Sequence, residues 1–233
     1  MGVNTGPRVA VVVFPGSNCD RDALSALAEL GVEADPVWHT VETLAGYDGV
    51  ILPGGFSYGD YLRAGALAAR SPVMGAVRRL ADDGGRVLGI CNGFQTLCEA
   101  GMLPGALTLN TSRRFHCVWS SLSVPEEGAG FLPGGDRLRL PIAHGEGCYR
   151  MGEGGWEALQ TTHRVILQYA GADGSVEPRY ALNGSDLNIA GVANRAGTIA
   201  GLMPHPERAM DARMGGADGR RFLGAWLGKE ALR

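Results

Sequence analysis

Short runs of apolar residues alternate with helix-like segments through the first hundred residues of the chain. Continuous apolar runs of this kind are typical of strands buried on both faces of a parallel sheet. The expected strands are Val9–Phe14, Pro36–Trp38, Gly49–Leu52 and Arg86–Ile90. Helices are expected from about Asp20 to a stop at Gly31, and over Pro72–Asp82. This alternation predicts an α/β fold with a doubly wound, mostly parallel sheet.

The pattern changes between residues 105 and 195, where shorter runs are separated by Gly, Asn and Asp turns. These runs predict an antiparallel β excursion, and they are Phe115–Val124, Arg137–Pro141, Val165–Tyr169 and Ile189–Asn194. A strand-like run at Thr198–Gly201 and a last helix over residues 219–232 return to the first pattern. No linker or repeat is visible. We therefore expect one domain over residues 8–233, preceded by a loose tail of residues 1–7.

The composition excludes several classes of protein. The 233 residues carry a net charge of −3, which offers no electrostatic footprint for nucleic acid or an anionic membrane. The apolar run at Val9–Phe14 is too short to span a bilayer. Five cysteines without a Cys-x-x-Cys pair, and without a signal peptide, predict free thiols and a cytoplasmic location. Neither zinc-ligand spacing nor a phosphate-binding glycine motif occurs, so we expect no metal and no nucleotide site on this chain.

The segment Gly89–Gln95, which reads Gly-Ile-Cys-Asn-Gly-Phe-Gln, carries the clearest chemical signal. A strand-like run precedes it and a helix-like run follows, so Cys91 is expected at a sharp strand-to-helix turn. This is the nucleophile-elbow arrangement with cysteine in place of serine. The N-terminus of the following helix favours a thiolate over a thiol. The alternative is a small buried cysteine beside an ordinary Gly-rich turn.

A histidine and a carboxylate stand two residues apart in the segment Leu202–Arg208. In an extended backbone, which the flanking prolines favour, His205 and Glu207 would point to the same side. That pairing suits the general base and the orienting acid of a Cys-His-acid triad. Taken alone, His205 could be a purely structural histidine. Its long sequence separation from Cys91 is no objection, because triad partners meet in space.

Two adjacent glycines, Gly54 and Gly55, follow a predicted strand in the segment Pro53–Asp60. Such glycines let the backbone approach a ligand and aim N–H groups at it. Acyl transfer requires about two N–H donors for the developing oxyanion. We expect one donor from this glycine loop and the other from the backbone of Asn92, the residue after the nucleophile. The alternative is a Gly-rich turn that binds nothing.

The elbow Gly-x-Cys-x-Gly-x-Gln resembles the signature of the class I glutamine amidotransferases, and Pro204–Glu207 is similar to that family's second motif. The resemblance extends to the branch that serves purine biosynthesis, the glutaminase subunits of phosphoribosylformylglycinamidine synthases. The segments that carry it are Pro15–Asp20, Pro53–Arg63, Ala143–Gly147 and Met203–Arg208. These motifs cover nearly the whole chain, and the resemblance implies a flavodoxin-like sheet.

The resemblance also implies residue roles. Cys91 attacks the side-chain amide of glutamine, His205 takes the thiol proton and delivers it to the leaving ammonia, and Glu207 orients His205. A γ-glutamyl thioester forms on Cys91, and water then cleaves it. The residues expected to line the glutamine pocket are Gln95, Phe56, His144 and Glu146.

Ammonia released into neutral water is mostly ammonium, which is a poor nucleophile, so an amidotransferase must pass it along a shielded path. Because this chain shows no ATP motif, the ATP- and Mg²⁺-dependent step is expected on another chain. The resemblance implies a hetero-oligomer with a large synthase subunit and a small accessory subunit. That complex converts formylglycinamide ribonucleotide to formylglycinamidine ribonucleotide, and no cofactor is expected on the present chain.

Two other interpretations stay open from the sequence. The first is another cysteine hydrolase of related fold, such as a γ-glutamyl peptidase or a DJ-1-like protein. The Pro-His-Pro-Glu segment and Gln95 argue against it. The second is a non-catalytic regulatory subunit, and the intact set of Cys91, His205 and Glu207 argues against that.

Overall fold

The computed structural model describes residues 6–127 and 130–228. Within them, one mixed sheet has the following strands in spatial order: β2 (Glu33–Trp38), β1 (Arg8–Val13), β3 (Gly49–Leu52), β4 (Arg86–Ile90), β11 (Ile199–Leu202), β10 (Ile189–Asn194), β9 (His163–Ala170), β6 (His116–Ser123) and β7 (Arg137–His144). Two short strands, β5 (Ala106–Thr108) and β8 (Cys148–Arg150), pair separately.

The half of the sheet from β2 to β11 is parallel throughout. Its central strands β3 and β4 are apolar and almost entirely buried, which explains their continuous hydrophobic runs. In the register of β4 and β11, Ile90 lies opposite Leu202. Parallel strands bring their carboxyl ends to the same edge of a sheet, where α/β proteins place their ligand sites. The residues that follow Ile90 and Leu202 therefore meet at this edge.

The half from β11 to β7 is antiparallel. Strand β7 lies at the end of the sheet and continues to His144, past its predicted end at Pro141. Proline has no N–H to donate, and an edge strand tolerates it because one side needs no ladder bond. Pro141 stands opposite Trp119 on β6. The strand therefore carries the chain through to the segment that was expected to line the pocket.

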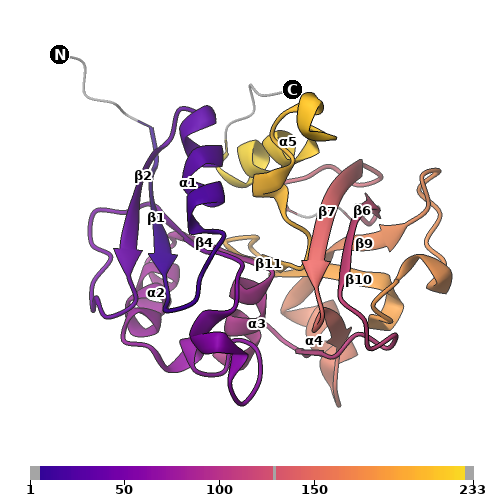
Figure 1. Cartoon of the computed structure of the whole chain (residues 1–233), viewed down its shortest axis with the longest axis horizontal. Helices are drawn as coiled ribbons and strands as arrows, with labels where there is room; N and C mark the ends of the chain where they lie inside the picture. The colour runs from indigo at the N-terminus through magenta and orange to yellow at the C-terminus, as the bar shows by residue number, and fades with distance from the viewer. Residues whose placement is uncertain (1–5, 128–129, 229–233) are drawn as a thin grey trace.

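Helices cover both faces of the sheet, with α1 and α5 on one side and α2 and α3 on the other (Figure 1). Their bounds are α1 (Asp20–Glu29), α2 (Val73–Asp82), α3 (Asn92–Glu99), α4 (Gly155–Thr161) and α5 (Asp218–Trp226). Gly31 takes a φ of 64° just after α1 and so ends the helix as predicted. The 3₁₀ turns are η1 (Ser57–Asp60), η2 (Ala68–Arg70), η3 (Pro178–Tyr180), η4 (Asp186–Asn188), η5 (Pro206–Arg208) and η6 (Ala212–Met214).

The predicted fold class, a mostly parallel doubly wound sheet with an antiparallel excursion, is confirmed. Helix α4 and strands β5 and β8 were not predicted, because they are short and flanked by glycines. The last helix ends at Trp226, and the end of its predicted range, 229–232, lies outside the described residues, as do residues 1–5 of the expected tail. Of the helices in the described residues, none has the length and hydrophobicity needed to cross a membrane.

Candidate active site

Cys91 sits between β4 and α3 with φ 50° and ψ −104°, in the left-handed half of backbone space. L-residues avoid this region at a cost of about 1–3 kcal/mol, and such strain concentrates at functional sites. The flanking glycines make the turn possible. A Cβ on Gly89 would lie 2.6 Å from the Gly93 carbonyl oxygen, and a Cβ on Gly93 would overlap the Leu52 carbonyl. The predicted elbow geometry is therefore present.

Backbone hydrogen bonds hold the elbow in place. The Cys91 N–H donates to the Leu202 carbonyl at 2.8 Å, and the Cys91 carbonyl accepts from Phe94 and Gln95 in the first turn of α3. The Cys91 Sγ lies 3.8 Å from the carbonyl oxygen of Ala143 on β7. Cys91 is 6% exposed. The sulfur is thus held at a helix N-terminus where the parallel and antiparallel halves of the sheet meet.

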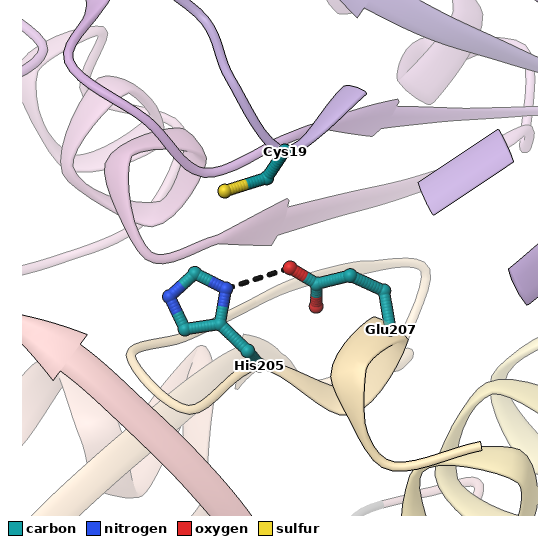
Figure 2. A group of neighbouring side chains, drawn as sticks. All are labelled: Cys19, His205 and Glu207. Atoms are coloured by element: carbon teal, nitrogen blue, oxygen red, sulfur yellow. Dashed lines mark hydrogen bonds and ion pairs between the residues drawn. The ribbon is translucent and has the colours of Figure 1, made fainter. Parts of the chain in front are cut away.

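His205 and Glu207 form a buried hydrogen-bonded pair. The His205 Nδ1–H donates to the Glu207 carboxylate at 2.6 Å, as Figure 2 shows. The expectation of an extended segment through Glu207 was wrong, because Pro206–Arg208 forms the 3₁₀ turn η5. Proline suits the first position of a helical turn, where its missing N–H is not needed. The turn still brings the carboxylate back onto the imidazole.

The imidazole of His205 is set up to carry a proton. Burial disfavours its charged form, but the charge of Glu207 and the nearby Cys91 outweigh burial and raise the pKa of His205 well above its ordinary value. With Nδ1 engaged by Glu207, the Nε2 atom has no hydrogen-bond partner among the described residues. A buried nitrogen without a partner is costly in an ordinary core and requires an explanation.

Cys91 and His205 meet at Gly54. A Cβ placed on Gly54 would lie 2.8 Å from His205 Cε1 and 3.4 Å from Cys91 Cβ. Only a glycine therefore fits between the thiol and the imidazole. A cysteine, a histidine and a carboxylate gathered in this order can carry out nucleophilic acyl transfer.

The residues expected to donate to the oxyanion are on the glycine loop and at the start of α3. Gly55 has a φ of 133°, and a Cβ there would approach the Asn18 nitrogen to 2.7 Å. Asn92 is the first residue of α3, so its backbone N–H has no acceptor within the helix. Gly54 and Asn92 thus adjoin Cys91, Gly55 packs against Asn18, and the role of their N–H groups stays a prediction.

The side chain of Asn92 links the glycine loop to α3, which the sequence did not predict. Its Oδ1 accepts from the Ser57 N–H at 3.1 Å, and its Nδ2 donates to Asp60 and to Gln95 at 3.1 and 2.9 Å. Gln95 in turn donates to the backbone carbonyl of Glu146 at 2.6 Å. The side-chain amides of Asn92 and Gln95 therefore tie together the glycine loop, α3 and the segment after β7.

The other predicted pocket residues divide into two groups. Gln95 is buried, and His144 is 3% exposed with a pKa lowered to about 4 by burial and by the neighbouring charges of His205 and His116. Phe56, in contrast, is 48% exposed, and its N–H donates to the Gly16 carbonyl. The structure thus brings His144, Gln95 and the Glu146 backbone to the site and leaves the Phe56 ring partly in solvent.

Cys19 is a second thiol beside the histidine, and no role was predicted for it. Its Sγ and the ligand atoms of His205 and Glu207 all lie within 4.8 Å of one another (Figure 2). These are residue types that can bind zinc. However, the Arg208 guanidinium donates to the Cys19 sulfur at 3.0 Å and to Asp22 at 3.0 Å, so a cation already occupies this side. Cys19 and Arg208 are thus polar neighbours of the His205–Glu207 pair.

Comparisons with known proteins agree with this geometry. The family model of the CobB/CobQ-like glutamine amidotransferase domain matches residues 6–217. Phosphoribosylformylglycinamidine synthase subunit PurQ of Thermus thermophilus is 51% identical over 93% of this chain and 96% of its own length. The same subunit of Moorella thermoacetica is 49% identical over 93% of both chains. A chain from the structure of PurLQS from Thermotoga maritima superimposes with a TM-score of 0.83 at 43% identity, covering 96% of this chain and 99% of that chain.

Proposed function

Because this chain belongs to the CobB/CobQ-like glutamine amidotransferase family, as its motifs predict, we propose that Cys91, His205 and Glu207 are its glutaminase triad. The chain serves purine biosynthesis as the glutaminase subunit of phosphoribosylformylglycinamidine synthase, a glutamine-dependent carbon–nitrogen ligase. Its own reaction releases ammonia from glutamine and leaves glutamate.

The observation that supports the triad most strongly is the state of the His205 ring. The Nδ1–H of His205 donates to Glu207 at 2.6 Å. The Nε2 atom is buried and has no hydrogen-bond partner among the described residues, and Gly54 lies between the ring and Cys91. A general base needs one nitrogen held by an orienting acid and the other available to the nucleophile.

The proposed reaction follows from these contacts. His205 Nε2 accepts the Cys91 proton, and the thiolate attacks the amide carbon of glutamine. The N–H of Asn92 and an N–H of the Gly54–Gly55 loop stabilise the resulting oxyanion. His205 then returns the proton to the leaving nitrogen, so that ammonia departs and a γ-glutamyl thioester remains on Cys91. Water, deprotonated by His205, attacks the thioester, and glutamate leaves with the Cys91 thiol restored.

The ammonia must reach an acceptor without equilibrating with water. We assign the ATP- and Mg²⁺-dependent activation of formylglycinamide ribonucleotide to a large synthase subunit, and we infer a small accessory subunit as the third component. The similar Thermotoga maritima chain comes from a structure of PurLQS, which supports an assembly of this kind. The cysteine content of the chain agrees with a cytoplasmic location for this complex.

Replacing Cys91 with alanine in the assembled complex tests the assignment. Glutamine-dependent synthesis should fall by at least about 10³-fold, because the covalent route is gone. Synthesis from added ammonium salt should stay within about twofold of wild type, because the partner's chemistry does not use Cys91. A Cys117→Ser variant, which changes an exposed cysteine, is the control. Loss of both activities in Cys91→Ala would show that Cys91 is structural.

A further inference from the structure

Asp60 places a carboxylate close to the residue that follows Cys91, and it has no role in the sequence analysis or in the mechanism above. It ends the turn η1, and its backbone has a φ of 53°. Asn92, the residue after Cys91, donates its side-chain amide to Asp60 Oδ1 at 3.1 Å. Tyr58 and Leu62 on the same loop also have positive φ values, of 54° and 70°. L-residues avoid this region, so the loop holds Asp60 in place at a cost in backbone strain.

A second carboxylate lies within electrostatic reach of the first. Asn92 bonds Gln95, and Gln95 bonds the backbone of Glu146, so the segments bearing both acids join the same side of α3. Burial, together with the charge of Glu146, raises the pKa of Asp60 to about 6. In the part of the chain that the structure describes, neither carboxylate forms an ion pair with a lysine, arginine or histidine.

Two buried polar side chains, one three residues before Asp60 and one two residues before Glu146, also lack partners. Ser57 is 2% exposed and His144 is 3% exposed. The Ser57 Oγ and both ring nitrogens of His144 have no hydrogen bond to any described residue. The Ser57 backbone is itself bonded to Asn92 Oδ1, so its hydroxyl belongs to the loop that carries Asp60. Buried hydrogen-bonding groups without a partner indicate that a ligand completes the site.

The charge of the missing ligand group follows from the groups that are present. Two carboxylates without a counter-ion favour a cation, and the neutral His144 does not compensate them. The α-ammonium is the cationic group of glutamine. Asp60 is hydrogen-bonded to the side chain of Asn92, the residue that follows Cys91, so a cation bound by Asp60 would lie next to the start of α3.

We propose that Asp60, supported by Glu146, binds the α-ammonium group of the glutamine whose side-chain amide meets Cys91. Asp60 thereby makes the site specific for an α-amino acid amide over a simple amide of the same length. This inference rests on the proposed glutaminase function and names the group that selects its substrate.

The test compares glutamine with glutaramate, which is glutamine without its α-amino group, in the assembled complex. Asp60→Asn keeps the shape and the oxygen that Asn92 bonds but removes the charge. It should lower kcat/KM for glutamine about 10- to 100-fold, mainly through KM, as expected for loss of a charged hydrogen bond. Its kcat/KM for glutaramate should stay within about twofold of wild type. Asp82→Asn, at the exposed C-terminal end of α2, is the matched control and should change neither value.

A loss that is equal for both substrates in Asp60→Asn would show that Asp60 only holds the loop, and would overturn the inference. Unchanged glutamine kinetics would overturn it as well.

Glu146→Gln repeats the comparison without altering the strained loop, and a smaller loss confined to glutamine is expected. A wild-type complex that hydrolyses neither substrate would refute the proposed function itself. If the wild-type complex hydrolyses glutamine normally and Asp60→Asn prefers glutamine over glutaramate as strongly as wild type does, only the α-ammonium assignment is refuted.

Discussion

At the scale of single residues, the site depends on a balance of buried charges. Glu207 does more than orient the ring, because its charge also raises the pKa of His205 against the cost of burial. Cys19 and Arg208 lie behind the pair, and the guanidinium contacts the Cys19 sulfur. The proposed triad is therefore embedded in a wider set of polar groups that contact one another.

Replacing Glu207 with glutamine tests this balance through the pH dependence of glutamine hydrolysis. A raised pKa means that His205 keeps its proton to a higher pH. The proton that His205 takes from Cys91 must stay on the ring until it is delivered to the leaving ammonia, so loss of that proton sets the basic limb of the kcat/KM profile. Removing the carboxylate charge lowers the pKa of His205, so this basic limb should move to lower pH. The rate at the optimum should fall by about 10²-fold, less than in His205→Ala, because an orienting group contributes less than the proton carrier. Glu29→Gln, which breaks an exposed ion pair with Arg220, should leave the profile unchanged, and an unshifted Glu207→Gln profile would contradict the account.

At the scale of elements, close packing of α3 against β3 explains the glycines of the elbow. The Gly93 backbone packs so tightly against the Leu52 carbonyl that no side chain fits between them. Gly93→Ala should therefore destabilise the fold by about 3 kcal/mol or more, which urea unfolding would measure. Gly75→Ala on the exposed face of α2 is the matched control, because its Cβ would meet only the flexible end of Arg79, at 3.6 Å. That control should stabilise the protein by up to about 1 kcal/mol, and a similar response from both variants would contradict the packing argument.

The elements that sequence patterns located best are those whose residues are buried on both sides. Strands β3, β4 and β10 have the predicted bounds, since a continuous apolar run leaves little freedom in where such a strand ends. The Pro206–Arg208 turn was missed because proline fits both an extended segment and the start of a helical turn. Contacts such as Arg208 to Cys19 and Asp60 to Asn92 join distant segments, and local patterns carry no information about them.

At the scale of the whole molecule, the two halves of the sheet have different roles in the site. The parallel half supplies the elbow after β4 and the histidine after β11. The antiparallel half returns β7 to the same place, where the Ala143 carbonyl contacts the Cys91 sulfur and the Pro141 carbonyl accepts from the His205 N–H. In Figure 1 the β7 arrow points down toward the region of α3 and α4. The antiparallel excursion thus closes over Cys91.

The central claim is that Cys91, and not the neighbouring Cys19, is the nucleophile that His205 activates. Labelling of the assembled complex with the glutamine-like electrophile diazo-oxo-norleucine, followed by peptide mass spectrometry, tests this most directly. The account predicts one covalent adduct on Cys91, which excess glutamine suppresses and which His205→Ala slows. An adduct on Cys19, or a complex that hydrolyses glutamine but yields no adduct on Cys91, would contradict it.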